Sequence, residues 1–186
     1  MTFSVFGYGS LVNRGTLPGF VSARPLAARG WRRAWRGTSR GKFGGRCALS
    51  VVADPQAHID GLVLTFEDEA WPLIRAREHN YDPLRLEEDP EVIIFRVHAE
   101  KDRYGDADHP ICLSYIDTTL QGFLTEFGDD GARRFMATTD GWGVPILDDR
   151  HEPTYPRAQK LSRDEQKRID DLLMSVDAMP ARPQEV

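Results

Sequence analysis

The chain has 186 residues, 40% of them hydrophobic and 28% charged, and its formal net charge is -5. This length is typical of one domain that buries about 70% of the surface its unfolded chain exposes. The negative charge disfavours bulk binding to polyanions. Two cysteines are too few for a disulfide framework, no apolar run approaches the roughly 18 residues of a membrane span, and no basic leader precedes the first apolar residues. These features predict a cytoplasmic protein that neither crosses a membrane nor binds one.

The first half of the chain is predicted to be mostly sheet. Alternating or continuous apolar runs indicate strands over residues 2–6, 26–36, 47–52, 59–66 and 92–97. Asp54-Pro55 is predicted to form the turn between the third and fourth of these strands. Asp68 is expected to cap a helix that carries Leu73 and Ile74 and frays at Asn80.

The second half changes to a helical period. Leu120, Phe123, Leu124 and Phe127 form one apolar stripe, which Gly128 is expected to close. Residues 138–155, rich in glycine and proline, are predicted to be an irregular connection. A capping box at residues 162–165 opens a last helix. Strands followed by helices predict an α+β domain over residues 1–178, with a loose tail over residues 179–186.

The most informative motif is Phe6-Gly7-Tyr8-Gly9-Ser10-Leu11, which ends the first apolar segment. Glycine allows the main chain to approach a ligand closely, and successive exposed amide groups form a concave site for an anion. A small carboxylate or phosphate would fit such a turn. Taken alone, the pattern is more often an ordinary tight turn.

A candidate chemical partner is Arg77-Glu78-His79-Asn80-Tyr81, at the end of the predicted helix. A carboxylate that is partly buried behind an apolar helix face has a raised pKa, as a general acid or base requires. The alternative is a solvated or salt-bridged surface glutamate, which is the commoner case.

The pair of motifs, in this order and some seventy residues apart, resembles the γ-glutamylcyclotransferase-like superfamily, with the bacterial ChaC branch nearest. The resemblance runs from residue 3 to about residue 135. It includes the strand ending Ile59-Asp60-Gly61-Leu62-Val63, the continuation from Tyr81 to Leu86, and the helical block around residues 115–135. Two positions bear on the match. Asn80 stands where that pattern commonly has glycine, and Leu11 follows Ser10 as in the ChaC branch.

The resemblance implies a small mixed β-barrel flanked by helices, with a cavity that holds a γ-glutamyl group. It implies Glu78 as the catalytic acid/base, with no metal and no cofactor. The implied substrate is a small γ-glutamyl compound, cyclised to 5-oxoproline. The substrate-binding residues that we expect are Gly7, Tyr8, Gly9, Ser10, Leu11, Tyr81 and Tyr155. Tyr155 is expected because a late tyrosine lines the site in related proteins, although it also fits as the anchor of a proline-rich loop.

Several other functions are compatible with parts of the sequence. A catalytically silent ligand-binding or interaction domain of the same fold is the most realistic, although the presence of Glu78 favours an enzyme. Residues 24–46 combine many arginines with Trp31 and Trp35, which suits nucleic-acid binding, but the net charge argues against it. The scattered histidines do not form a metal motif. Ser10 lacks the Gly-x-Ser-x-Gly elbow of serine hydrolases.

Overall fold

The computed structural model describes residues 1–41, 44–178 and 180–181. Its sheet is built on two long strands, β2 (Ser22–Gly41) and β3 (Gly44–Glu67), which pair antiparallel along most of their length. β1 (Thr2–Gly7) pairs antiparallel with the last residues of β3. β5 (Val92–Val97) lies parallel to β1, and β4 (Tyr81–Arg85) closes this edge antiparallel to β5.

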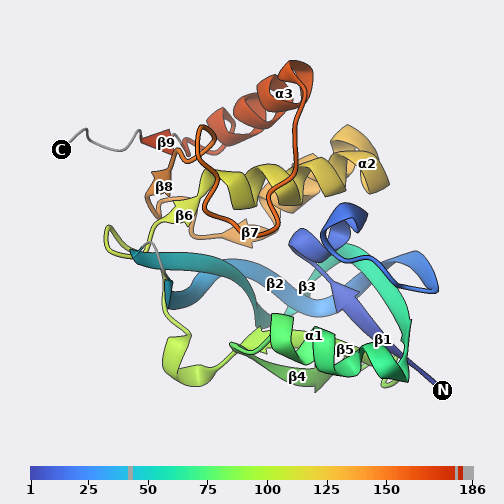
Figure 1. Cartoon of the computed structure of the whole chain (residues 1–186). Helices are drawn as coiled ribbons and strands as arrows, with labels where there is room; N and C mark the ends of the chain where they lie inside the picture. The colour runs from blue at the N-terminus through green and yellow to red at the C-terminus, as the bar shows by residue number, and fades with distance from the viewer. Residues whose placement is uncertain (42–43, 179, 182–186) are drawn as a thin grey trace.

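The remaining elements cover this sheet from two sides, as Figure 1 shows. α1 (Trp71–Arg77) lies beside β1, β4 and β5, whereas α2 (Leu113–Ala137) lies across the long strands and α3 (Arg163–Met174) packs on α2. Four two-residue strands join the second half to the sheet by parallel pairing: β6 (Ile111–Cys112), β7 (Thr139–Asp140), β8 (Ile146–Leu147) and β9 (Pro180–Ala181). The predicted α+β class, a mixed sheet flanked by helices, is confirmed.

The predicted division into two strands at Asp54-Pro55 is wrong, because residues 44–67 form one continuous strand. A local turn contact is present there, since the backbone N–H of Gln56 donates to Oδ1 of Asp54 at 3.0 Å. His58 pairs with Arg29 and Ala53 with Trp31, so four residues of β3 stand opposite Gly30 alone. This is a large bulge, and Gly30 accommodates it with a positive φ of 78°. A bulge also tolerates Pro55, which has no N–H to donate to a ladder.

The first helix is shorter than predicted. Asp68 does not cap it; a single 3-10 turn, Asp68–Ala70, precedes α1, whose N-cap is Ala70. The helix ends at Arg77 with Glu78 as its C-cap, before Asn80. Tyr81 then begins β4, a strand that the sequence analysis did not predict.

The helical predictions in the second half are confirmed. Gly128, at φ 66° and ψ -169°, interrupts α2 where the apolar stripe ends. Ser162 and Glu165 form the reciprocal capping box of α3. The connection over residues 138–155 contains the short β7 and β8. Of the predicted tail, Pro180–Ala181 form β9; the other residues after 178 lie outside the described part of the chain.

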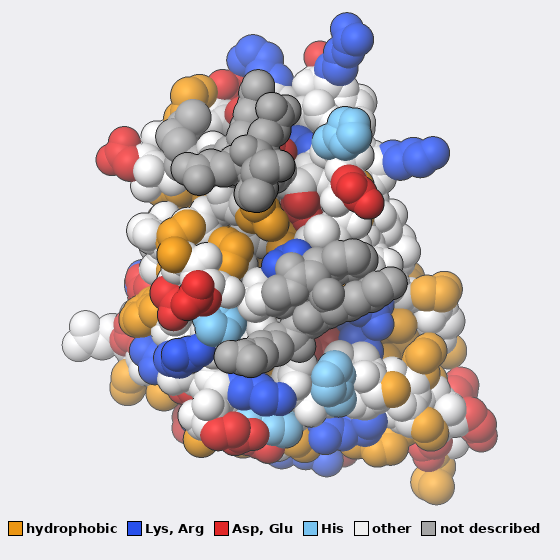
Figure 2. Space-filling model, turned by 60° about the vertical axis from the view of Figure 1, so that its left-hand side comes forward, with side chains coloured by type: hydrophobic (Ala, Val, Ile, Leu, Met, Phe, Trp, Pro, Cys, Tyr) orange, Lys and Arg blue, Asp and Glu red, His pale blue; other side chains and the backbone are white. Residues whose placement is uncertain are grey.

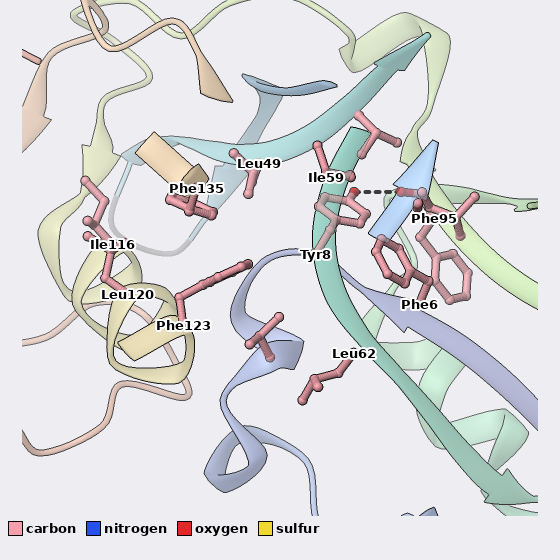
Figure 3. Close-up of a cluster of buried hydrophobic side chains, with 14 of the residues drawn as sticks. Phe6, Tyr8, Leu49, Ile59, Leu62, Phe95, Ile116, Leu120, Phe123 and Phe135 are labelled. Atoms are coloured by element: carbon pink, nitrogen blue, oxygen red, sulfur yellow. Dashed lines mark hydrogen bonds between the residues drawn. The ribbon is translucent and has the colours of Figure 1, made fainter. Parts of the chain in front are cut away.

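The sheet and α2 share one hydrophobic core (Figure 3). Phe6, Ile59 and Phe95 contribute from the strands, and Leu120 and Phe123 from α2, each buried almost completely. This core fixes the end of β1 relative to α1 and α2, and so positions the glycine motif that follows β1.

Candidate active site

A cavity of about 700 Å³ lies where several separate parts of the chain meet. Its walls come from β2 and β3 near the paired Gly41 and Gly44, from the residues around the end of α1 and the start of β4, and from residues 154–157. Ser10, Lys101, Cys112 and Tyr115 complete the lining. A smaller hollow of about 40 Å³ is lined by Tyr8 to Leu11 and shares Ser10, Glu78, Tyr81 and Tyr115 with the cavity.

Glu78 lines both hollows with a carboxylate that is mostly withdrawn from solvent. Its side chain is only 13% exposed, and one carboxylate oxygen lies 3.2 Å from Nε of Arg77. Burial raises the pKa of Glu78, and the neighbouring cations Arg77 and Arg157 oppose that rise. The carboxyl therefore has the environment of a group that exchanges protons nearer neutrality than a surface glutamate does.

Arg77 joins Glu78 to the glycine motif. Its guanidinium donates hydrogen bonds to the carbonyl oxygen of Thr16 at 2.9 Å, and to the hydroxyls of Thr16 and Ser10 at 3.2 Å each. The side chain is 4% exposed. Because all these partners are fixed, Arg77 holds the end of α1 against the turn after β1.

The glycine motif forms the beginning of a 3-10 turn, Ser10–Val12, with Gly9 as its N-cap. A Cβ at Gly9 would lie 3.1 Å from the hydroxyl of Tyr115 and 3.4 Å from a methyl of Leu49, which is tighter than ordinary contact. Glycine therefore lets the backbone pass close to the wall of the site.

Ser10 connects the motif to Tyr155, 145 residues later. The hydroxyl of Tyr155 donates to Oγ of Ser10 at 2.8 Å, and Arg77 donates to the same oxygen. Neither partner is a general base at neutral pH, so this environment does not activate Ser10 as a nucleophile.

Three tyrosines line the larger cavity, and two of them, Tyr81 and Tyr115, also line the smaller hollow. Tyr81 donates its hydroxyl to the carbonyl oxygen of Leu49 at 2.9 Å, and the rings of Tyr115 and Tyr155 lie 4.9 Å apart. Burial raises the pKa of Tyr81 and of Tyr115, so both are neutral at physiological pH. Tyr115 was not among the predicted site residues, because nothing local in its sequence marks it.

The structure separates the predicted binding residues into two groups. Four of the predicted site residues line the larger cavity: Ser10, Glu78, Tyr81 and Tyr155. Tyr8, Gly9 and Leu11 line only the smaller hollow. Gly7 is not among the lining residues of either; a Cβ there would lie 2.6 Å from that of Leu11, so Gly7 permits a close backbone turn.

The side chain of Tyr8 belongs to the core of the sheet. It is 7% exposed, and its hydroxyl donates to the carbonyl oxygen of Phe95 at 2.6 Å, the dashed line in Figure 3. The buried guanidinium of Arg33 holds the backbone of the same residue through the Tyr8 carbonyl at 2.8 Å. Tyr8 therefore anchors the turn.

Both cysteines also line the larger cavity, as free thiols. Burial raises the pKa of Cys47 to about 12 and also raises that of Cys112, so neither is a thiolate at neutral pH. Among the described residues, no three histidine, cysteine, aspartate or glutamate side chains gather as a metal site. No helix in the described ranges has the length and apolarity to cross a membrane.

The arginine-rich segment 24–46 is not a free basic stripe. Three of its arginines form ion pairs at 2.6 to 2.9 Å: Arg24 with Asp89, Arg32 with Asp140 and Arg36 with Asp102. A fourth, Arg33, is fully buried. Figure 2 shows acidic and basic side chains interspersed over one face of the molecule.

No family model matches the chain, and no curated protein matches it in sequence. Solved structures do match it in shape. One named gamma-glutamyl cyclotransferase superposes over 92% of this chain and 99% of its own, with a TM-score of 0.52 at 12% identity. An uncharacterized protein from Homo sapiens superposes over 91% and 98%, with a TM-score of 0.53 at 12% identity.

A third match, YkqA from Bacillus subtilis, superposes over 75% of this chain and 56% of its own, with a TM-score of 0.51 at 14% identity. At these identities the likeness concerns the fold. It extends over nearly the whole chain for the first two structures, and it agrees with the fold that the two sequence motifs imply. The chain therefore has the γ-glutamyl cyclotransferase fold.

Proposed function

We propose that the protein is a γ-glutamylcyclotransferase-type enzyme that cleaves a γ-glutamyl amide and releases 5-oxoproline and an amine. The observation that carries the proposal is Glu78, a largely buried carboxylate that lines a cavity together with Ser10 and Tyr155. The fold supports the same reaction class. As part of the same proposal, we place the protein nearest to the ChaC branch and in the cytoplasm.

The chemistry requires little beyond orientation and one proton carrier. The α-amino nitrogen of the substrate attacks its own γ-carbonyl carbon, a new C–N bond closes the five-membered ring, and the original amide C–N bond breaks. A well-oriented intramolecular attack gains on the order of 7 to 11 kcal/mol. Glu78 accepts the proton from the attacking nitrogen and returns it to the leaving nitrogen. No metal or cofactor takes part in this proposal.

The glycine motif would hold the glutamyl end of the substrate. The first N–H groups of a helical turn have no acceptor within that turn, so those of Gly9, Ser10 and Leu11 are suited to a carboxylate or to the developing oxyanion. Tyr155 and Tyr81 would form the wall beside it. In this assignment Tyr8 and Gly7 support the motif from behind.

The test is the release of 5-oxoproline from glutathione, γ-glutamyl dipeptides and γ-glutamyl amines. Wild-type protein is expected to turn over at least one of them, and Glu78→Gln to lose the activity while its circular dichroism stays native. Glu69→Gln is the matched control, because Glu69 is exposed and lies outside both hollows. Activity of Glu78→Gln equal to wild type would show that the proton carrier is misassigned.

The alternative is a silent domain that binds γ-glutamyl compounds without cleaving them. Calorimetric titration of wild-type protein with the same compounds separates the two functions. Binding without any 5-oxoproline would replace the enzyme by a ligand-binding domain, and inert behaviour in both measurements would contradict a γ-glutamyl ligand altogether.

A further inference from the structure

Arg33 is a cation that the fold encloses completely. It lies in β2, it is fully buried, and its guanidinium lies over the rings of Phe123 and Phe135, 4.9 and 4.8 Å from their centroids. Burial lowers the pKa of Arg33 to about 9, so the group keeps its charge at neutral pH. The two aromatic faces offset part of the free energy that is lost when this charge leaves water.

No carboxylate among the described residues forms an ion pair with Arg33. The carboxylate of Asp60 favours its charge from a distance but pairs with Arg134 at 2.7 Å. The guanidinium donates to neutral oxygens only: the carbonyl of Tyr8 and the hydroxyl of Thr138, each at 2.8 Å, and the carbonyl of Asp60. An apolar residue of similar size often serves a core as well as a buried charge does. Packing alone therefore does not account for a cation at this position.

The bond to Tyr8 places this charge at one end of a peptide unit of the glycine motif. The carbonyl of Tyr8 and the N–H of Gly9 belong to the same trans peptide, so the N–H points away from Arg33. Within the described ranges, the N–H of Gly9 donates to no protein acceptor. Gly9 lines the smaller hollow together with Glu78. One end of the peptide thus accepts from a buried cation, and its other end is left for a ligand.

A cation at the carbonyl end makes the N–H at the other end a stronger donor. Resonance in the amide couples the two ends, and hydrogen bonds in series polarise one another by about 10 to 30% per bond. A charged donor polarises more than a neutral one, and the dry surroundings of Arg33 screen its field little. The donor is also fixed before a substrate arrives, which is the condition for stabilising charge that develops during a reaction.

We propose that Arg33 is a positioning residue of the reaction: through the Tyr8–Gly9 peptide it holds and polarises the Gly9 N–H as a donor to the oxyanion that develops on the γ-carbonyl oxygen. This inference rests on the proposed function and adds a residue that does not touch the substrate. An interaction made only in the transition state changes kcat and leaves KM unchanged. Loss of a whole oxyanion donor lowers kcat about 100- to 1,000-fold, so weakening one should lower it about tenfold.

The first test compares kcat and KM of wild type, Arg33→Gln and Arg33→Lys on one γ-glutamyl substrate. Arg33→Gln removes the charge but keeps a hydrogen-bond donor, and kcat is expected to fall about tenfold at constant KM. Arg33→Lys keeps the charge with fewer donors and is expected to recover most of kcat. Denaturant midpoints of all variants show whether each one folds.

Thr138→Val is the matched control. It removes a second partner of Arg33, and so disturbs the surroundings of the guanidinium, but it leaves both the charge and the bond to Tyr8 in place. Its denaturant midpoint is expected to fall, because a buried donor loses its acceptor, while kcat stays at the wild-type value. A loss of kcat equal to that of Arg33→Gln would mean that packing around Arg33, and not its charge, supports the reaction.

A second measurement needs no change at Arg33, and so decides the point even if Arg33→Gln does not fold. In the phosphonate analogue of glutamate, a tetrahedral phosphonate replaces the γ-carboxyl group and stands in for the oxyanion. With isotope-labelled glycine in wild-type protein, the amide proton of Gly9 is expected to move downfield as this compound is added, because it donates to a charged acceptor. Gly9→Ala identifies the signal, and the signal of Gly143, outside both hollows, should not move.

The outcomes are distinct for the two proposals. If wild type releases no 5-oxoproline from any γ-glutamyl compound, the proposed function fails and the role of Arg33 with it. If wild type is active but folded Arg33→Gln keeps its kcat, or Arg33→Lys is as slow as Arg33→Gln, the enzyme stands and the role of the charge is wrong. A change confined to KM, or a Gly9 signal that does not respond to the phosphonate, would also overturn it.

Discussion

Glu78 occupies a position that disfavours its own negative charge. It is the C-cap of α1, where the unpaired carbonyl groups of a helix end carry partial negative charge, and it is largely buried. The positive charges of Arg77 and Arg157 act in the opposite direction and lower the pKa of Glu78. A carboxyl balanced in this way is able both to accept and to release a proton.

The pH dependence of the reaction should report this balance. Because burial raises the pKa of Glu78, the acid limb of kcat/KM is expected above the ordinary range of a glutamate, with activity lost as the pH falls and the base becomes protonated. Arg157 lowers the pKa of Glu78, so Arg157→Gln should move the limb to higher pH. A limb that stays in place in this variant would contradict the coupling, as pH profiles of kcat/KM from pH 4 to 9 can show.

Gly9 offers a second test at a single residue. Because a Cβ would lie 3.1 Å from the Tyr115 hydroxyl, Gly9→Ala must shift the turn or the tyrosine by a few tenths of an ångström. Small displacements in a positioned site cost about tenfold or more in rate, so kcat/KM should fall with little change in the denaturant midpoint. Gly143→Ala is the control, since no atom lies within 4 Å of its Cβ and its φ is not positive. Equal activity of the two variants would contradict a close approach at Gly9.

At the scale of the elements, residues 149–155 are held in place by one buried carboxylate. Asp149 accepts hydrogen bonds from the backbone N–H and hydroxyl of Ser114, at 2.8 and 2.7 Å, and from those of Thr154, at 2.8 and 2.6 Å. Ser114 Oγ in turn accepts from the N–H of Tyr155 at 3.3 Å. This network attaches the connection to the start of α2 and directs Tyr155 to Ser10.

Replacing Asp149 by asparagine should therefore loosen this segment. One acceptor oxygen is lost and buried donors are left unpaired, which costs about 2 kcal/mol or more in the free energy of unfolding, measured in urea. Burial alone would raise the pKa of Asp149, but the hydrogen bonds from Thr154 and Ser114 lower it. The stabilisation is therefore complete above the unfolded pKa of about 3.9 and is lost as the pH falls through the lower folded value.

The neighbouring Asp148 provides the matched control for this prediction. It accepts one backbone hydrogen bond, from Arg150 at 3.2 Å, and is less buried than Asp149. Asp148→Asn should change the free energy of unfolding by about 0.5 kcal/mol or less. If both substitutions cost the same at pH 7, Asp149 does not organise the segment.

The same elements show what the sequence could predict and what it could not. The stripe of α2, its interruption at Gly128 and the capping box of α3 are local patterns, and the structure agrees with each. The bulge at residues 54–57 depends on Gly30 in the partner strand, which no window around Pro55 contains. Predictions failed where pairing with a distant strand decided the local conformation.

In the candidate site, too, some residues could be predicted from local sequence patterns and others could not. Glu78 and the glycine motif could be predicted because each belongs to a short, continuous sequence pattern. Arg77 stood inside the quoted motif, but its bonds to Ser10 and Thr16 span more than 60 positions of the chain. Tyr115 and Arg157 reach the cavity only through the docking of α2 and of the long connection. The folded chain was therefore needed to identify Tyr115 and Arg157 as residues that line the cavity.

At the scale of the whole molecule, the arginines and their acidic partners lie in different segments of the sequence but form ion pairs in the folded chain. Residues 24–46 are rich in arginine, whereas their ion-pair partners lie in later segments, between residues 89 and 140. Folding brings the two sets together as ion pairs, and the face in Figure 2 shows acidic and basic side chains interspersed. Four basic side chains line the larger cavity, Arg46, Arg77, Lys101 and Arg157, against the single carboxylate of Glu78.

This arrangement predicts how the protein behaves toward polyanions. With a net charge of -5, and with Arg24, Arg32 and Arg36 paired and Arg33 buried, the protein should pass through a heparin column at about 0.15 M salt. A nucleic-acid-binding module would be retained and would elute only at high salt, because each phosphate contact releases counterions. Retention of this protein until high salt would therefore contradict the small-ligand function proposed for the cavity and favour a nucleic-acid-binding module.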